Sequence, residues 1–412
     1  MQNCRRRSDC RLCGGREFEK VLALAPTPPA NAFVSEAQCA DPQPAYPLDL
    51  WFCRKCTHVQ LLDIVDPSLL FESYPYVSGT SPVFVSHFEE YAADVIERFA
   101  LASGDFVVDI GSNDGTLLRP FQAAGMNVLG IDPARAIAES ATASGVPTQT
   151  GFFTLRTALD IRRQFGAASC ITANNVFAHI DDLGDVADGV RELLGPEGVF
   201  VFEVSYLLDV YEKILFDSIY HEHLDYHTVA PLLPFFDAHG LELFAAERID
   251  THGGSLRGFA QLAGGSHAAN GLDDLIGRER RAGLHRAETL HGYSTRIDGV
   301  GRQLGELITA LKSDGKRVAG YGAPAKATTL MHHFDIGQDQ IEFIIDDNPL
   351  KQGLFSPGLH VPVLPSEAIA ERKPDYLVIL AWNFAEPIMQ KCSEFAACGG
   401  RFIVPLPRVR VV

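Results

Sequence analysis

The densest cluster of reactive side chains lies between residues 216 and 227. These twelve residues, F-D-S-I-Y-H-E-H-L-D-Y-H, include three histidines, two tyrosines and three carboxylates. A core strand or helix does not tolerate so many titratable groups without partners, so the segment predicts a site. His221 and His223 stand two residues apart, whereas zinc proteases need two histidines four residues apart on a helix. Metalloprotease chemistry is therefore not supported.

Four of the nine cysteines form two Cys-x2-Cys pairs, Cys10 with Cys13 and Cys53 with Cys56. Such a pair lets two thiolates face one tetrahedral ion, and four thiolates suit zinc. The 39 residues between the pairs exceed the spacing of about 15 to 20 in common zinc ribbons, but their six prolines indicate an irregular loop. Reduced core cysteines and a redox pair are the weaker alternatives, because both pairs lie in Gly- or Arg-containing turns. We expect a structural zinc site.

A glycine turn follows a buried, β-branched stretch at residues 106–110. The sequence D-I-G-S-N-D-G, residues 109–115, leads from this stretch into a helical pattern, as in the first βα unit of a doubly wound sheet. Gly111 permits close approach of a ligand to the backbone, and Gly115 permits close packing of the helix. The G-x-G-x-x-G fingerprint is absent, which argues against a nicotinamide cofactor here.

Further strands are expected at residues 127–132, 168–173 and 198–203. Asp132 ends the first of them, where a ribose diol is held in Rossmann-like sites. Together these strands resemble the class I S-adenosylmethionine (SAM) methyltransferase core. Phe152 and Phe153 either flank the adenine or belong to the core. The expected cofactor residues are Asp109, Gly111, Ser112, Asn113, Gly115, Asp132 and Asn174.

Five motifs in a fixed order extend the resemblance to nearly the whole chain. They are the two cysteine pairs, Y-P-Y-V-S-G-T-S at 74–81, the glycine turn, the histidine-rich segment and G-Y-G-A-P-A-K at 320–326. In this order they resemble the nucleotide-diphosphate-sugar C-methyltransferases of deoxysugar biosynthesis, which methylate carbon 3 of 4-keto-6-deoxy sugars. The resemblance implies a zinc-binding domain (1–75), a SAM-binding methyltransferase domain (76–300) and a C-terminal nucleotide-sugar-binding α/β domain (301–412). It also implies thymidine diphosphate as the commonest carrier, with guanosine and cytidine carriers open.

The same resemblance implies the site residues. The family's Tyr-x-Glu-His motif corresponds to Tyr220, Glu222 and His223, and a second active-site histidine corresponds to His179. The active-site tyrosine of the Y-P-Y segment is either Tyr74 or Tyr76. Substrate-binding residues are expected at His252, Gly253, Gly254, Gly322, Lys326 and Asn383.

Methylation at carbon requires such residues. A hydrogen beside a ketone is acidic because the enolate places charge on oxygen, so a base and an oxyanion donor must act together. Neutral imidazole, with a pKa of about 6.5, accepts a proton at pH 7. We expect His223 to be the base, with Glu222 orienting it or acting as the base itself. Tyr220 or His179 would donate to the C4 oxygen, and the methyl group must lie about 3 to 3.5 Å from the attacking carbon.

The sequence of the C-terminal half predicts a second, smaller parallel α/β domain. Strands are expected at residues 317–322, 341–347, 376–383 and 401–404, after an Arg-rich helical stretch at 275–316 that bridges domains. The fold class is therefore α/β, a Rossmann-like SAM core between a zinc-binding module and a Rossmann-like C-terminal domain. Helix amides and Lys326 would face a diphosphate.

Composition narrows the partners. The 412 residues carry 52 acidic and 35 basic side chains, a net charge of -17, which opposes binding to nucleic acid or to an anionic membrane. No apolar run of about 18 residues and no signal peptide is visible, so a cytoplasmic protein is expected. No heptad or repeated patch stands out, so we expect a monomer.

Three other functions compete with the sugar C-methyltransferase. The SAM core alone also fits an O- or N-methyltransferase. An NAD-dependent nucleotide-sugar oxidoreductase would use Gly320, Gly322 and Asp346. A noncatalytic zinc- and SAM-sensing module leaves the cluster around Tyr220 and His223 unexplained.

Overall fold

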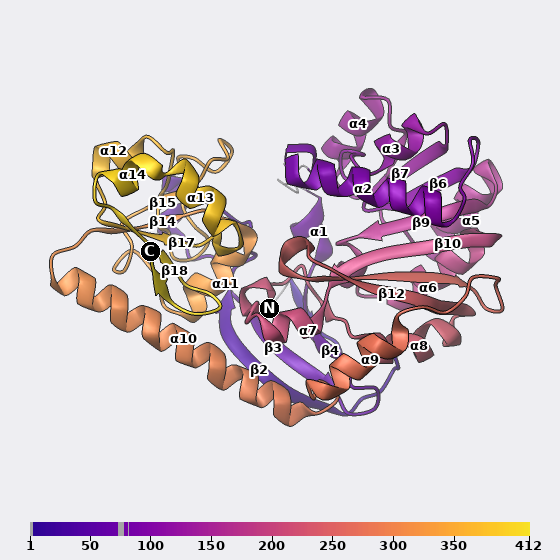
Figure 1. Ribbon diagram of the computed structural model, residues 1–412, viewed down its shortest axis with the longest axis horizontal. Coiled ribbons are helices and arrows are strands. Elements are labelled where there is room, and N and C mark those ends of the chain that lie inside the picture. The colour runs from indigo at the N-terminus through magenta and orange to yellow at the C-terminus, as the bar shows by residue number, and fades with distance from the viewer. Residues whose placement is uncertain (1–2, 73–77, 81) are drawn as a thin grey trace.

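Two α/β lobes and a set of N-terminal strands make up the molecule (Figure 1). The computed structural model describes residues 3–72, 78–80 and 82–412. A seven-stranded sheet forms one lobe and a six-stranded sheet forms the other. The N-terminal strands lie at the lower centre of Figure 1, between the two lobes. No helix among the described residues is long and apolar enough to cross a membrane.

The seven-stranded sheet has the order β12-β13-β10-β9-β6-β7-β8. All neighbouring strands from β10 to β8 are parallel, and β13 is antiparallel to both β10 and β12. The order reverses between β6 and β9, which makes the carboxyl ends of these two strands the expected ligand crevice. The strands are β6 (Phe106–Ile110), β7 (Asn127–Asp132), β8 (Thr148–Thr150), β9 (Ala168–Asn174), β10 (Leu194–Ser205), β12 (Leu241–Ile249) and β13 (Ser255–Leu262).

Helices cover both faces of this sheet. Val108 and Ile110 of β6 pack into one buried cluster with residues of α5, α6 and α8, whereas Val107 packs into another with residues of α2 and α3. Successive strand residues point to opposite faces, so a sheet covered on both sides needs the continuous apolar run that the sequence has. The helices of this lobe are α2 (Pro82–Arg98), α3 (Leu118–Ala123), α4 (Arg135–Ala143), α5 (Leu155–Phe165), α6 (Leu183–Leu193), α7 (Leu207–Glu212), α8 (Val229–Ala238) and α9 (Leu272–Arg281).

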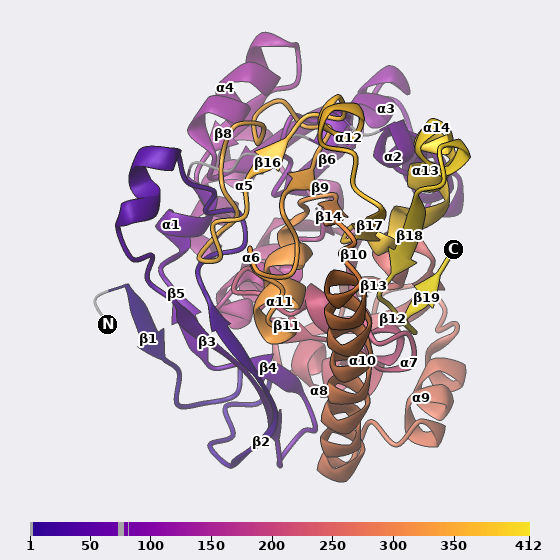
Figure 2. The same cartoon turned by 90° about the vertical axis from the view of Figure 1, so that its left-hand side faces the viewer.

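A four-stranded sheet of order β11-β4-β3-β2 and a two-stranded sheet of β1 and β5 form the N-terminal module (Figure 2). The prediction of an irregular loop between the cysteine pairs is wrong, since β2 and β3 lie within it. Four of the six prolines occupy the connection between these strands, and Pro26 lies at a break in the β2–β3 register. The elements are β1 (Cys4–Arg6), β2 (Phe18–Thr27), η1 (Glu36–Ala40), β3 (Tyr46–Cys53), β4 (Val59–Leu61), β5 (Asp63–Val65), α1 (Pro67–Phe71), η2 (Ser78–Thr80) and β11 (Asp225–Tyr226).

The six-stranded sheet has the order β16-β15-β14-β17-β18-β19 and is parallel except for β19. Helix α10 (Ala287–Ser313) runs along the lower edge of Figure 1 and contacts both β2 and β14. The predicted boundary at residue 300 lies within this helix, and the three domain limits stay predictions. The other elements are β14 (Val318–Tyr321), α11 (Ala325–His333), β15 (Ile344–Ile345), β16 (Val363–Leu364), α12 (Ala368–Arg372), β17 (Tyr376–Ile379), α13 (Ala385–Lys391), α14 (Ser393–Ala397), β18 (Arg401–Val404) and β19 (Arg410–Val411).

Candidate active site

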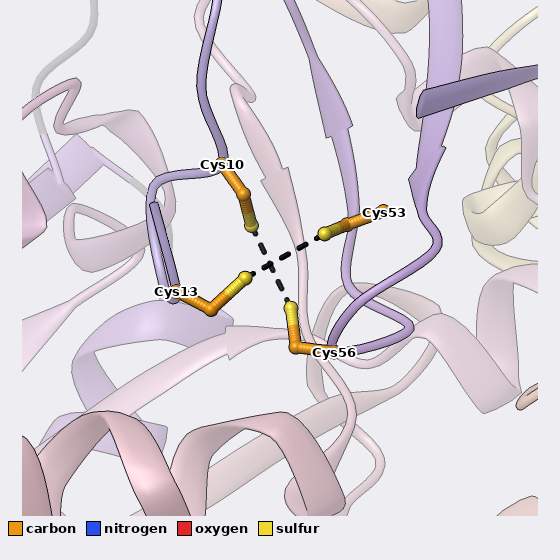
Figure 3. Close-up of side chains that lie close together, drawn as sticks. All are labelled: Cys10, Cys13, Cys53 and Cys56. Carbon is orange, nitrogen blue, oxygen red and sulfur yellow. Dashed lines mark hydrogen bonds between the residues drawn. The ribbon is translucent and has the colours of Figure 1, made fainter. Parts of the chain in front are cut away.

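The four paired cysteines meet at one point of the N-terminal module (Figure 3). The Sγ atoms of Cys10 and Cys56 are 3.6 Å apart, as are those of Cys13 and Cys53. All four sulfurs lie within 4.8 Å of one another. Tetrahedral zinc with Zn–S bonds of about 2.3 Å separates its sulfur ligands by about 3.8 Å. The cluster therefore fits a structural zinc ion.

The same backbone turn builds both halves of the cluster. Gly14 donates its N–H to the carbonyl of Cys10, and Thr57 donates to the carbonyl of Cys53. Both residues have positive φ, 64° and 69° respectively. A left-handed residue four positions after the first cysteine closes each turn, so that the two thiols of the pair face the same side.

The glycine turn at the end of β6 leaves no room for side chains at two positions. A Cβ on Gly111 would lie 2.8 Å from Val176 Cγ2, and one on Gly115 would lie 2.7 Å from Val146 Cγ1. Both glycines have positive φ, 72° and 79°. The close packing predicted at Gly115 matches this geometry, whereas the predicted approach of a ligand to Gly111 stays a prediction.

Asp132 ends β7 with both carboxylate oxygens held by backbone amides. Asn113 N donates to Oδ2 at 2.8 Å, and Ala134 N donates to Oδ1 at 2.8 Å. Burial raises the pKa of this carboxyl. Each oxygen keeps a second lone pair that a ribose hydroxyl can use. Asp132 therefore fixes the glycine turn and remains available to the cofactor.

Asp109 lies deeper in β6. Thr172 Oγ1 donates to its Oδ1 at 2.6 Å. Burial raises the pKa of Asp109 to about 7, although the Thr172 hydrogen bond opposes the shift. The Asp109 carboxyl group therefore changes between its neutral and its charged form near neutral pH.

Polar atoms at the carboxyl end of β9 and in the glycine turn fit a bound polar cofactor. The amide oxygen and nitrogen of Asn174, and the hydroxyl of Ser112, are buried without a hydrogen-bond partner among the described residues. A buried polar group left unpaired costs about 1 to 3 kcal/mol. A cofactor with hydroxyl, amino and carboxylate groups would satisfy these atoms. Of the two phenylalanines, Phe153 is buried and Phe152 is exposed.

The side chains of Asn113 and Asp114 bind the turn η2. Ser78 N donates to Asn113 Oδ1 at 2.9 Å, and Gly79 N donates to Asp114 Oδ2 at 3.1 Å. The glycine turn is thereby joined to the part of the chain that precedes α2. Tyr74 and Tyr76, the two candidates for an active-site tyrosine, lie outside the described residues.

Four aromatic rings stack in the order Phe71, His179, His223 and Tyr220. The ring centroids of His179 and His223 are 5.0 Å apart at an interplanar angle of 20°. Tyr220 lies 4.0 Å from His223, and Phe71 lies 5.7 Å from His179. The structure thus brings together three of the predicted catalytic side chains, from segments far apart in the sequence.

The backbone fixes the tautomer of His223. Its Nδ1 lies 2.7 Å from the carbonyl oxygen of Ser218, which can only accept, so Nδ1 carries the proton. In the neutral ring Nε2 is then a free acceptor. Burial lowers the pKa of His223 to about 4 and that of His179 well below its usual value. Both residues are half-buried.

Glu222 and His221 face the N-terminal module instead. Asn31 Nδ2 donates to Glu222 Oε1 at 3.2 Å. His221 is buried, with Nε2 3.2 Å from the carbonyl of Tyr46. His221 therefore packs the segment against the N-terminal module, in keeping with its place between the motif positions.

Lys326 and Asn383 lie where the C-terminal lobe meets the histidine-rich segment. Lys326 Nζ is 4.7 Å from the centre of the Trp382 ring, and Trp382 Nε1 donates to Asp217 Oδ2 at 2.6 Å. Burial lowers the pKa of Lys326 and raises that of Asp217, and the attraction between the two opposes both shifts. Asp217 Oδ1 and Asn383 Oδ1 are buried without a partner in the described part of the chain. These atoms fit a polar ligand between the C-terminal lobe and the histidine-rich segment.

The glycines expected near the substrate have packing roles in the structure. A Cβ on Gly322 would lie 2.5 Å from Ala381 Cβ, and one on Gly254 would lie 2.0 Å from Asp209 Cγ. Lys213 Nζ donates to the carbonyl of Gly253 at 2.6 Å. His252 lies in the short turn η5 (Thr251–Gly253). Contacts of these residues with a substrate stay predictions.

Sequence reasoning missed several residues of this region. Asn31 lies in the proline-rich connection and Trp382 follows β17, and neither carries a local signal of its role. Asp217 is different, since it belongs to the segment that the sequence singled out. Its unusual density of charges was the available signal.

Three family models match consecutive parts of the chain. Residues 10–71 match a zinc binding domain, residues 84–247 a methyltransferase domain, and residues 250–407 the C-methyltransferase C-terminal domain. Together they follow the order that the motifs predict.

A curated relative is similar over almost the full length. The C-methyltransferase NovU of Streptomyces niveus is 36% identical over 405 residues, which are 98% of this chain and 96% of that protein. Among solved structures, a SAM-dependent methyltransferase from Clostridium acetobutylicum covers 44% of this chain and 92% of its own, with 14% identity and a TM-score of 0.36. The PH0226 protein from Pyrococcus horikoshii covers 46% of this chain and 96% of its own, with 14% identity and a TM-score of 0.37.

Proposed function

The chain belongs to the SAM-dependent C-methyltransferases with an N-terminal zinc-binding domain, and from this premise we propose that its acceptor is carbon 3 of a nucleotide-diphosphate 4-keto-6-deoxyhexose. The five motifs that resemble the nucleotide-sugar C-methyltransferases support this acceptor. Thymidine diphosphate is the expected carrier.

One feature of the site supports attack by carbon above all others. His223 presents an unprotonated Nε2 next to the Tyr220 ring and the His179 ring. Methylation of an enolised carbon needs a base and an oxyanion donor side by side, whereas a hydroxyl or amine acceptor does not need to lose a carbon-bound proton.

The proposed reaction begins with proton removal. His223 takes the proton from carbon 3 at Nε2, and the Tyr220 hydroxyl or the His179 ring donates a hydrogen bond to the C4 oxygen, where the negative charge collects. Glu222, whose Oε1 accepts from Asn31, is the alternative base. When bound, SAM supplies the electrophilic methyl group.

The remaining residues bind and align. Asp132, Asn174 and the glycine turn hold the cofactor at the carboxyl ends of β6, β7 and β9. Lys326 and the amides at the start of α11 face the diphosphate, so the net charge of -17 is no obstacle, because the site needs only local cations and amides. Asp217 and Asn383 offer acceptors to the sugar or the nucleoside.

Incubation with SAM and thymidine, guanosine and cytidine diphosphate 4-keto-6-deoxyhexoses in deuterated water tests the proposal. We expect a methylated sugar and solvent deuterium at carbon 3 of recovered substrate with at least one carrier. A His223→Ala variant should lose both activities by about 100-fold or more, while keeping SAM affinity. The matched control is His285→Ala, at an exposed histidine. The proposal would be refuted if none of the 4-keto sugars were methylated and an oxygen or nitrogen acceptor were methylated instead.

A further inference from the structure

The histidine-rich segment continues as a strand of the N-terminal sheet. Strand β11 (Asp225–Tyr226), two residues after His223, pairs with β4, with Asp225 opposite Gln60. The amide of Leu61 also donates to the carbonyl of Leu224 at 2.8 Å. The backbone that carries His223 is therefore held by the sheet next to the cysteine cluster.

The same backbone also holds the turn that carries His179. Leu224 N donates to the carbonyl of Ala178 at 2.8 Å, within η3 (Phe177–His179). Leu224 thus lies between β4 on one side and η3 on the other. This three-part junction therefore joins the backbone segments that carry the two histidine rings.

Arg11, which lies between Cys10 and Cys13 in the sequence, contacts residues in or next to all three parts of the junction. Its Nη1 donates to the carbonyl of Leu61 at 2.6 Å and to Gln60 Oε1 at 3.1 Å. Its Nε donates to Asp181 Oδ1 at 3.1 Å and lies 3.7 Å from Asp225 Oδ2. Asp181 stands two residues after His179, just as Asp225 stands two residues after His223.

Burial makes the contacts of the Arg11 guanidinium sensitive to substitution. The side chains of Arg11 and Asp225 are fully inaccessible to solvent. A buried ion pair is costly to break because the remaining charge stays buried, and the planar guanidinium holds several acceptors in fixed directions, which an ammonium group does not. His58, whose Nε2 is 2.6 Å from Asp225 Oδ1, completes the surroundings of this carboxylate.

We propose that Arg11 is a positioning residue for methyl transfer. By binding the backbone segments that follow His179 and His223, Arg11 sets the separation of the two rings. The inference rests on the proposed function for the roles of the two histidines. The zinc-binding module then has a second task besides its own stability, because its first cysteine pair carries the residue that aligns the catalytic rings. A displacement of about 1 Å in such a site costs about 100-fold in rate.

Arg11→Lys tests the inference, and Arg54→Lys is its matched control. Both arginines directly follow the first cysteine of a pair, but Arg54 is exposed and pairs only with Glu19 in the described part of the chain. Each variant is compared with the wild type in four readouts. These are zinc per chain, SAM affinity, kcat with the sugar, and the imidazole NMR resonances of His179 and His223 in histidine-labelled protein. We expect Arg11→Lys to keep zinc and SAM affinity, to lower kcat at least about tenfold and to shift both resonances, and Arg54→Lys to resemble the wild type.

Wild-type kcat and unshifted histidine resonances in Arg11→Lys would overturn the inference. If Arg11→Lys loses zinc, Asp181→Asn decides, because it leaves Arg11 and the four cysteines in place. A zinc-loaded Asp181→Asn protein with lowered kcat supports the inference, and one with normal kcat overturns it. If the wild type methylates no nucleotide sugar, the proposed function fails. The histidine resonances alone then test whether Arg11 positions the two rings.

Discussion

A single backbone carbonyl decides how His223 can react. Because Ser218 accepts from Nδ1, Nε2 is the ring nitrogen that can take a proton in the proposed reaction. The fixed tautomer needs no rearrangement before proton transfer. One local contact thus decides which ring nitrogen of His223 would act in the proposed reaction.

The low pKa of His223 gives a testable pH dependence. A base works unprotonated, and burial holds the pKa of His223 at about 4, below the value of about 6.5 for free imidazole. We expect kcat/KM for the sugar, at saturating SAM, to stay level from pH 7 to pH 5 and to fall only as pH approaches about 4. Circular dichroism at each pH checks that the protein stays folded. A midpoint near 6.5 would contradict a buried base.

Residue types were predictable from the sequence, but their orientation was not. The density of titratable groups in residues 216–227 identified the segment, and the structure then places its members in different surroundings. Tyr220 and His223 join the stack with His179, whereas Asp225 and His227 pack against His58 of the N-terminal module. This division depends on contacts that no local pattern contains, such as that of Asp225 with His58, 167 positions away.

At the scale of elements, the turn between β6 and α3 is the most sharply constrained. Its backbone must turn with φ of 72° at Gly111 while passing directly over Val176. The turn then carries Asn113 to both Asp132 and η2. Any displacement of this turn alters the cofactor site and the chain segment next to it together.

Gly111→Ala should weaken SAM binding at least about tenfold, since the new Cβ meets Val176 at 2.8 Å in a strained backbone conformation. Isothermal titration calorimetry measures the change. Gly145→Ala is the control, because Gly145 also has positive φ, 94°, but has no atom within 4 Å of an added Cβ. Equal SAM affinity in the two variants would contradict a role for the close approach.

The cysteine cluster should support activity through the sheet it organises. Cys56→Ser is expected to reduce zinc from one equivalent per chain, to lower the thermal midpoint and to abolish turnover, because β3, β4 and β11 share one sheet. Metal analysis, thermal unfolding and kcat are the readouts, with Cys398→Ser at an exposed thiol as control. A zinc-free variant with full activity would separate the cluster from catalysis.

Most elements of the two α/β lobes were predictable, and the reason is physical. Parallel strands buried on both faces require continuous apolar runs, as in residues 106–110, 127–132 and 376–379, and the expected α/β fold class with a SAM core is confirmed. The strands between the cysteine pairs were missed because prolines dominate that stretch. The two-residue strand β11 could not be predicted, because its pairing with β4 joins distant parts of the chain.

At the scale of the whole molecule, the C-terminal lobe is anchored on the histidine-rich segment. Helix α11 contacts β2 and η4 (Phe216–Ser218). Thr329 Oγ1 donates to the carbonyl of Ile219 at 2.7 Å, and Thr328 Oγ1 donates to that of Ala30 at 2.9 Å. Both hydroxyls are buried, so the two lobes and the N-terminal module meet at one polar seam.

Thr329→Val tests this seam. The substitution leaves the Ile219 carbonyl without its side-chain donor, at a cost of about 1 to 3 kcal/mol. We expect a thermal midpoint lower by a few degrees and a higher KM for the sugar, with SAM affinity unchanged, because the cofactor site lies in the other lobe. Thr309→Val, at an exposed threonine of α10, is the control. An unchanged midpoint and KM would show that the anchor is dispensable.

The position of the transferred methyl group tests the central claim most directly. The measurement is the NMR spectrum of the product formed from SAM labelled with 13C in its methyl group and a nucleotide-diphosphate 4-keto-6-deoxyhexose. A labelled methyl group coupled to sugar carbon 3 is the predicted result. A labelled methyl group bound to oxygen or nitrogen, or to another carbon of the sugar, would contradict the account.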